Sequence, residues 1–267
     1  MRALRTSIQG LGALTLSAAS FVRMLFSVFV RTEVLVLRGR WKSADLVTQM
    51  FEIGNRSVLF VMVTLGFLGM VLVFQTCLQA GRVTGDLSFV GAEFIKILVH
   101  EFGPTLTAMM LATRVGAGIA AEVGSMVVTE QVDALRMSGV DPVEHLIVPR
   151  FLACCLMTAV LAILGSVVAL GLGALTAWTS FQVNPRVFLN AQRVMSGDLL
   201  VGLIKSLAYG AAVPLVAGTC GLAARGGSEG VGSATTRAVI GSSFAVILLD
   251  FLLSAFGYFF LQAETGA

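Results

Sequence analysis

The chain has 267 residues, of which 57% are hydrophobic and only 12% are charged, and its mean hydropathy is +0.91. Ordinary soluble domains are about one quarter charged, so this composition excludes a soluble globular protein. The formal net charge is +3, but the basic residues are not interleaved with aromatic residues, and we expect no nucleic-acid partner. The four cysteines form no CxxC pair and have no matching His, which argues against a disulfide or a metal site.

Five stretches are long and apolar enough to cross a bilayer, which takes about 20 apolar residues in a helix. Segments of about ten residues with alternating polarity, which are typical of membrane β-barrels, do not occur. We therefore predict an all-α integral membrane protein with five transmembrane helices. The predicted spans are residues 58–81, 102–121, 151–181, 199–224 and 238–261.

The N-terminal region is harder to interpret. Residues 8–30 are apolar, but arginines flank them on both sides and Arg23 lies within them. A sixth span would put one basic flank outside, so we predict that residues 1–42 form an amphipathic helix in the membrane interface. A cleaved signal peptide fits less well, because the chain just after it is strongly basic. Residues 43–262 would then be the transmembrane bundle, and residues 1–267 a single domain.

Lysine and arginine are distributed unevenly between the two sides of the predicted bundle. Residues 1–56 hold eight, and the loops after the second and fourth spans hold two each. The loops on the opposite side hold three in total. Because basic residues collect on the cytoplasmic side, we expect the N-terminus and the loop after the second span to be cytoplasmic.

That loop contains the most polar stretch in the middle of the chain, EQVDALRMSGVDPVEHLIVP at residues 130–149. Val128, Val132 and Leu135 recur at helical spacing, which predicts a short amphipathic helix over residues 127–137. Its acids fall near its start, where the helix dipole favours them. Gly139 is typical of the residue that ends such a helix.

A second helix is predicted to begin directly afterwards and to become the third span. Asp141, Pro142 and Glu144 have the spacing of an N-cap, a first helical residue and a capping-box partner. The loop would thus be a helix, a glycine hinge and a helix that re-enters the membrane. An ordinary capped loop fits the same pattern.

Two charges are predicted deep in the membrane. Each ionised group near the bilayer centre costs on the order of 3 kcal/mol, so it needs a partner or a wet cavity. Counting residues along the second and fifth spans puts Arg114 and Asp250 at similar depth. We therefore expect Arg114 and Asp250 to form an intramembrane ion pair.

A second charged group is expected nearer the outer side. The same depth argument brings Glu101 of the second span beside Lys205 of the fourth. Pro104 cannot donate a backbone hydrogen bond, so we expect it to kink the helix next to His100 and Glu101 and to open a partly wet cavity. An ordinary interfacial cluster, with Lys96 extended toward the membrane surface, is the alternative.

Four stretches of the sequence resemble the MlaE/YrbE permeases, which work with MCE proteins in lipid transport. The polar loop, TEQVDALRMSGVDPVEHLIVPR, also resembles the EAA motif by which ABC importer permeases seat a coupling helix in their ATPase. The other three stretches occur in the order found in the family. They are GFLGMVLVFQ at residues 66–75, HEFGPTLTAMMLATRVGAGIAAEVGSM at 100–126 and RGGSEGVGSATTRAVIGSS at 225–243, followed by Asp250.

The resemblance implies roles for particular residues. The family pattern carries Arg where this chain has His100, which weakens the expectation of a fixed positive charge there. The residues expected to bind or translocate lipid are His100, Glu101, Lys205, Phe74, Gln75 and Leu78. The residues expected to couple the permease to an ATPase are Glu130, Asp133, Ala134, Leu135 and Gly139.

The resemblance also implies partners. The chain lacks a GxxxxGK[ST] phosphate loop, so ATP and Mg²⁺ would be bound by a separate ABC ATPase subunit, and no cofactor is expected in this chain. The other expected partners are an MCE-domain periplasmic lipid-binding protein, a small accessory subunit on the ATPase, a second copy of the permease and membrane phospholipids. The expected location is a bacterial inner membrane rather than a plastid envelope, with a role in outer-membrane lipid homeostasis.

Two other functions remain open at this stage. A secondary transporter would use Asp250 and Glu101 as proton relays, and a passive scaffold would only hold an MCE assembly in the membrane. An enzyme is not expected, because no Ser-His-Asp arrangement or metal-ligand cluster is visible in the sequence.

Overall fold

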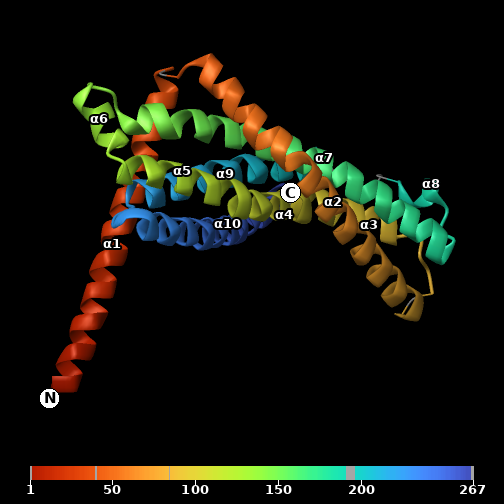
Figure 1. Ribbon diagram of the computed structural model, residues 1–267. Coiled ribbons are helices and arrows are strands. Elements are labelled where there is room, and N and C mark those ends of the chain that lie inside the picture. Colours follow the sequence, from red (N-terminus) through yellow and green to blue (C-terminus); the bar gives the residue numbers. More distant parts are fainter. Residues whose placement is uncertain (1, 40, 84, 191–195, 266–267) are drawn as a thin grey trace.

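The computed structural model describes residues 2–39, 41–83, 85–190 and 196–265, and all regular elements there are helical (Figure 1). The first part of the chain forms α1 (Arg2–Leu37) and α2 (Ser43–Val83). The next part forms α3 (Val90–Ile97), η1 (Leu98–Phe102), α4 (Gly103–Leu111), η2 (Ala112–Gly116), α5 (Ala117–Val128) and α6 (Gln131–Met137). The rest forms η3 (Val143–Ile147), α7 (Val148–Phe181), α8 (Pro185–Phe188), α9 (Ser196–Leu222) and α10 (Gly227–Thr265).

Five helical segments in the described part of the chain are long and apolar enough to cross a membrane, as predicted. The second combines α3 to α5 with the two π-helical turns between them, and the third combines η3 with α7. The five segments are Ser43–Val83, Val90–Val128, Val143–Phe181, Gly197–Leu222 and Gly227–Gly257. The prediction of an all-α membrane protein with five spans is therefore confirmed.

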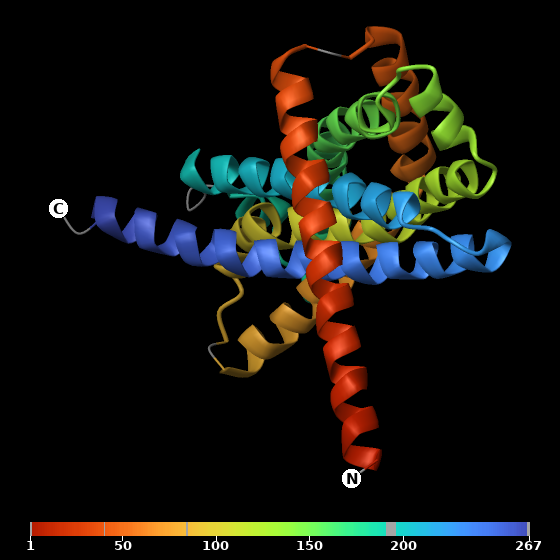
Figure 2. The ribbon, with the colours of Figure 1, turned by 90° about the vertical axis from the view of Figure 1, so that its left-hand side faces the viewer.

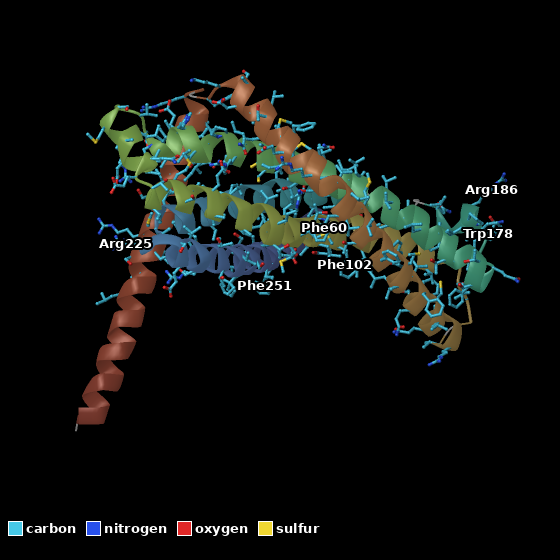
Figure 3. All side chains as sticks on the ribbon, in the orientation of Figure 1. Phe60, Phe102, Trp178, Arg186, Arg225 and Phe251 are labelled. Carbon is cyan, nitrogen blue, oxygen red and sulfur yellow. The ribbon has the colours of Figure 1, made fainter. Side chains whose placement is uncertain are left out.

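The spans pack around α9, which contacts α4, α5, α7 and α10, while α2 lies along α7. The main apolar core joins α2, the second span, α7 and α9. The bundle has two ends, which we name by the short helices found there: the α6 end and the α8 end (Figure 1). Arg225 lies at the α6 end, and Trp178 and Arg186 lie at the α8 end (Figure 3). Phe60, Phe102 and Phe251 lie between the two ends, as expected of a membrane-embedded belt.

Two helices differ in direction from the rest. Figure 2 shows α10 at full length where α7 is seen almost end-on, so α10 is steeply inclined to α7. In the same view α1 lies across α9 and α10, and its C-terminal half packs on the bundle through Val28, Thr32 and Leu35. The prediction that residues 1–42 lie in the membrane interface remains a prediction.

The second and third spans contain π-helical turns that the sequence analysis did not predict. In η1 the backbone N–H of Gly103 donates to the carbonyl of Leu98, one residue further back than in an α-helix. Pro104 follows at the start of α4. A π-helical turn widens the helix locally and often marks a functional site. The irregularity expected at Pro104 therefore begins in the turn before it.

Candidate functional site

A buried lysine lies where the second, fourth and fifth spans meet. The side chain of Lys205 on α9 is 0% exposed, and its Nζ lies 2.6 Å from Oε2 of Glu101. The same Nζ lies 3.3 Å from Oδ1 of Asp250 and donates a 2.8 Å hydrogen bond to Oγ of Ser254. Both acids keep access to the surface, because their side chains are 34% and 27% exposed. Glu101 and Lys205 thus meet as the sequence analysis expected.

Four further hydrogen bonds complete this group of side chains. Tyr209 and Thr105 both donate to Oδ1 of Asp250, over 2.6 Å and 3.3 Å. Ser254 donates to Oε1 of Glu101 over 3.1 Å, and Nδ1 of His100 lies 3.0 Å from the same oxygen. We call the seven residues the Lys205 network: His100, Glu101, Thr105, Lys205, Tyr209, Asp250 and Ser254. With a neutral imidazole, two carboxylates and one ammonium give it a formal charge of −1.

Helical spacing explains why these residues meet. Residues four apart share one face of a helix, and each of the three helices contributes one charged residue and one hydroxyl four positions later. The pairs are Glu101 and Thr105, Lys205 and Tyr209, and Asp250 and Ser254. The three hydroxyls were not predicted, although their spacing from the charged residues is visible in the sequence.

The predicted ion pair between Arg114 and Asp250 is wrong. Asp250 is held by Lys205, while Arg114 donates to the hydroxyl of Ser57 on α2. Because Thr105 donates a hydrogen bond to Asp250, Asp250 lies beside the Thr105 position of the second span. Arg114 lies nine residues further on, which is about 13 Å along a helix. The depth count failed because α10, which begins at Gly227, carries Asp250 further toward the α8 end than the count assumed.

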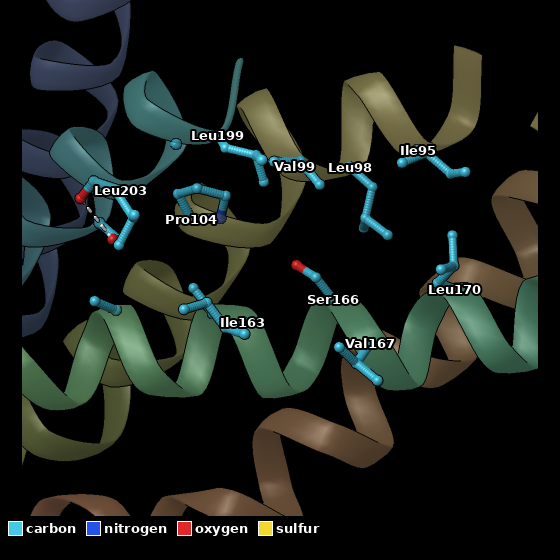
Figure 4. A pocket seen from close by; sticks show the side chains of 14 residues that line it. Ile95, Leu98, Val99, Pro104, Ile163, Ser166, Val167, Leu170, Leu199 and Leu203 are labelled. Atoms are coloured by element: carbon cyan, nitrogen blue, oxygen red, sulfur yellow. Dashed lines mark hydrogen bonds between the residues drawn. The ribbon is translucent and has the colours of Figure 1, made fainter. Parts of the chain in front are cut away.

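An apolar cavity of about 300 Å³ lies between the second span, α7 and α9. Figure 4 shows Pro104, Leu98 and Leu203 on one side and Ile163, Ser166 and Leu170 of α7 on the other. The complete lining is Ile95, Leu98, Val99, Pro104, Ala159, Ala162, Ile163, Ser166, Val167, Leu170, Leu199, Gly202, Leu203 and Ser206. Two of these residues are serines and one is a glycine, and the side chains of all the others are hydrocarbon.

The cavity and the Lys205 network lie on different faces of the same two helical segments. On the second span Leu98, Val99 and Pro104 line the cavity, whereas His100 and Glu101 belong to the network. The cavity next to Pro104 is thus apolar and does not include His100 or Glu101, and the partly wet cavity expected beside those two residues remains a prediction. One helical segment stands between an apolar cavity and a charged group.

The three predicted lipid-contacting residues on α2 belong to neither feature. Phe74, Gln75 and Leu78 are absent from the cavity lining and from the network as the described residues define them. The ring of Phe74 instead packs against that of Phe181 on α7, with centroids 5.4 Å apart. Their expected role in lipid binding therefore stays a prediction, with no support from the cavity or from the Lys205 network.

The predicted coupling helix is shorter than expected. The helix was predicted to run from residue 127 to 137, but α5 extends to Val128 and the chain then breaks at Glu130, whose φ is 61°. A left-handed residue cannot continue a right-handed helix, and this conformation is costly for a residue with a side chain. Glu130 therefore separates α5 from α6, although the apolar spacing continues across the break. The separate helix α6 contains Asp133, Ala134 and Leu135.

The C-terminal end of α6 has the predicted form. Gly139 has φ 75°, its N–H donates to the carbonyl of Arg136, and the N–H of Val140 donates to that of Leu135. These two bonds define a Schellman motif, in which glycine is the favoured residue. Oδ1 of Asp141 accepts the N–H of Val143 at 3.0 Å, so Asp141 caps the third span as predicted.

One side of α6 is anchored and the other is free in the described structure. Val132 packs into an apolar cluster with Val28 and Leu35 of α1 and with residues at the start of the third span. Asp133 and Ala134 are exposed on the other side, and Met137 is 90% exposed. A 3.9 Å ion pair between Arg31 and Asp141 ties α1 to the same loop. At this end of the bundle α6 is therefore held by packing on one side and exposed on the other.

A family model and several relatives match most of this chain. The family model described as Permease MlaE matches residues 46–256. The chain belongs to the MlaE permease family. The match covers both the Lys205 network and α6.

Several relatives are similar over most of their length. A "Probable ABC transporter permease protein", slr1045 of Synechocystis, is 35% identical over 88% of this chain and 90% of its own. A protein of the same description from Rickettsia prowazekii is 32% identical over 78% of this chain and 81% of its own. The chloroplastic protein TRIGALACTOSYLDIACYLGLYCEROL 1 of Arabidopsis thaliana is 30% identical over 83% of this chain and 63% of its own.

Family membership and the five spans establish the class of protein. This MlaE-family chain is a multi-pass membrane permease subunit of the ABC transporter class, and such subunits are not themselves catalytic. Membership implies an ATPase partner. Among the described residues, no group of three or more His, Cys, Asp or Glu is placed to hold a metal ion.

Proposed function

We propose that this chain is the permease subunit of an ATP-driven transporter that moves phospholipid between a cell inner membrane and an MCE-domain partner. The observation that carries the proposal is the pairing of the Lys205 network with the apolar cavity, one on each side of η1 and the start of α4. A phospholipid has a charged headgroup and apolar chains. Two adjacent sites of these two kinds suit such a molecule.

The exposed charges of the network indicate which part of a headgroup it would hold. Lys205 is buried, whereas Glu101 and Asp250 remain partly exposed. A passing headgroup therefore meets carboxylates first. This favours the ammonium group of a zwitterionic phospholipid over its phosphate, since opposite charges at close range attract even in a polar environment.

The exposed side of α6 is the proposed contact with the ATPase. Val132 fixes α6 to the bundle, while Asp133, Ala134 and Met137 are available to a partner. Movement of α6 would be transmitted to the second and third spans, because α6 connects them directly. The positive-inside rule puts this end in the cytoplasm, with the ATPase and its small accessory subunit.

The α8 end would then face the MCE-domain protein. The name of the Arabidopsis relative, TRIGALACTOSYLDIACYLGLYCEROL 1, is that of a glycolipid, which supports a lipid substrate. We also propose a homodimer of permeases. One face of α10 supports it by exposing large apolar side chains, among them Ile240, Phe244, Ile247, Phe251 and Phe256.

Filling the apolar cavity tests the proposal. Ser166 points into the cavity (Figure 4), so Ser166→Phe should lower ATP-dependent phospholipid transfer from proteoliposomes by about tenfold or more. Val160, on the same helix, is outside the cavity lining and is exposed. Val160→Phe is therefore the matched control and should transfer lipid normally. Normal transfer by Ser166→Phe in an intact assembly would contradict the proposal.

Two further measurements separate the alternatives. A passive scaffold predicts unchanged lipid transfer after Glu101→Leu, whereas the permease proposal predicts a loss. A proton-coupled transporter predicts that a protonophore stops transfer and that removal of ATP does not. The permease proposal predicts the reverse.

A further inference from the structure

A polar cavity, distinct from the apolar one, lies on the other half of the second span, toward the α6 end. Its volume is about 190 Å³, and α2, the η2–α5 segment and the first turn of α7 enclose it. We call it the arginine cavity. Its lining is Gln49, Glu52, Ile53, Arg56, Arg114, Val115, Gly118, Ile119, Glu122 and Arg150.

Two of its three arginines are matched by carboxylates. Arg150 lies 2.6 Å from Glu122 and also donates to the carbonyl of Leu146 at 2.8 Å. Arg56 lies 3.8 Å from Glu52. The lining residues thus have three positive and two negative charges, a formal charge of +1.

Arg114 accounts for the excess positive charge. In the part of the chain that the structure describes, its one hydrogen-bond partner is the neutral hydroxyl of Ser57, and no carboxylate lies within ion-pair distance. A guanidinium stays protonated in proteins. Arg114 therefore carries an unmatched charge inside a membrane-spanning segment, where such a charge needs an anion or water.

The cavity has room and access for an anion. A Cβ built on Gly118, in the lining, would meet no atom within 4 Å, so the space beside it is open. A neighbouring cavity of about 280 Å³ shares Gln49, Glu122 and Arg150 with it and continues to His145 and Pro149 near the α6 end. A ligand can therefore approach from the membrane surface at that end.

We propose that the arginine cavity binds a phosphate group, with Arg114 as its principal ligand. The planar guanidinium donates two parallel hydrogen bonds to phosphate oxygens, and this geometry distinguishes it from lysine. The phosphate comes either from a phospholipid of the leaflet at the α6 end or from free phosphate. Ile53, Val115 and Ile119 in the lining favour the lipid, because they suit its chains. This site is separate from the Lys205 network.

Lipid counting by native mass spectrometry tests the proposal. The purified full chain, stripped of lipid in detergent, is titrated with phosphatidylglycerol. Arg114→Gln should lose one bound lipid per chain, or bind it at least tenfold more weakly, and Arg114→Lys should show an intermediate affinity. Gly118→Phe should lose the same lipid by occupying the cavity, and Gly118→Ala should retain it.

Inorganic phosphate alone serves as the second probe. If millimolar phosphate raises the Tm of the wild type but not of Arg114→Gln, and no phosphatidylglycerol is lost in the variant, the site takes free phosphate. If neither probe distinguishes the wild type from both Arg114→Gln and Gly118→Phe, the proposal is overturned. Because Gly118→Phe keeps all charges, its result stands even if Arg114→Gln fails to fold.

The outcome does not depend on the proposed transport function. All binding is measured without ATP or partner subunits. Ser166→Phe should keep the lipid that Arg114→Gln loses, because the two positions line different cavities. Loss of that lipid in both variants would contradict two independent sites.

Discussion

The two halves of the second span hold their charges in opposite ways. Toward the α8 end, Glu101 joins a network in which each charged group has a partner of opposite charge, and the sum is −1. Toward the α6 end, Arg114 faces a cavity with an excess charge of +1 and has only a hydroxyl partner. The first group is built from contacts within the protein. In the second, one residue, Arg114, has no opposite charge beside it in the described structure, as expected of a place where an anion binds.

Removing the central cation of the Lys205 network should have the largest effect on the free energy of unfolding. Lys205→Met leaves Glu101 and Asp250 close together without a counterion. Breaking a buried charge pair in this way costs about 3–5 kcal/mol, and denaturant unfolding in detergent would measure it. The triple variant Lys205→Met/Glu101→Gln/Asp250→Asn should recover most of that loss. A triple variant as unstable as Lys205→Met would show that the charges are not the cause.

A pair of glycine substitutions should show a smaller contrast in packing. A Cβ at Gly210, next to Tyr209 of the network, would lie 2.7 Å from the carbonyl oxygen of Cys154, whereas one at Gly118 meets nothing within 4 Å. Gly210→Ala should therefore lower the free energy of unfolding by about 1–3 kcal/mol. Gly118→Ala should stay within about 0.5 kcal/mol of the wild type. Equal effects in the same unfolding assay would contradict the contrast.

The smallest expected effect concerns Thr107, which lies between the two halves on α4. Its hydroxyl is buried and has no hydrogen-bond partner among the described residues. Thr107→Val keeps the shape and removes a polar group that burial leaves unsatisfied, so stability should be unchanged or rise by up to about 1 kcal/mol. A clear loss of stability in thermal unfolding would show that the hydroxyl has a partner in the membrane.

Much of the fold could be predicted because long apolar runs permit few structures in a membrane. The five spans, the Gly139 stop and the Asp141 cap all follow from local sequence and are present. The meeting of Glu101 and Lys205 also followed from depth, since both lie near the same membrane surface. These features depend on residue order and not on how helices tilt.

The errors arose where geometry between helices decides the outcome. Asp250 lies beside Lys205 and not Arg114, because α10 carries it further toward the α8 end than the depth count assumed. Glu130 breaks the helix through its backbone conformation, while the apolar spacing around it continues unbroken. The division of one helix into a charged face and a cavity face required the positions of α7 and α9 on its two sides.

The central claim is that α6 transmits the work of a separate ATPase to a lipid-moving bundle, and one substitution tests it directly. Gly139 and Gly85 both have positive φ, 75° and 69°, and neither would clash through a Cβ. Gly139→Val therefore strains the end of α6, and Gly85→Val applies the same strain to a loop at the α8 end. In proteoliposomes with the assembled partner ATPase, Gly139→Val should abolish ATP-dependent phospholipid transfer and Gly85→Val should not. Equal transfer by the two variants would contradict the claim.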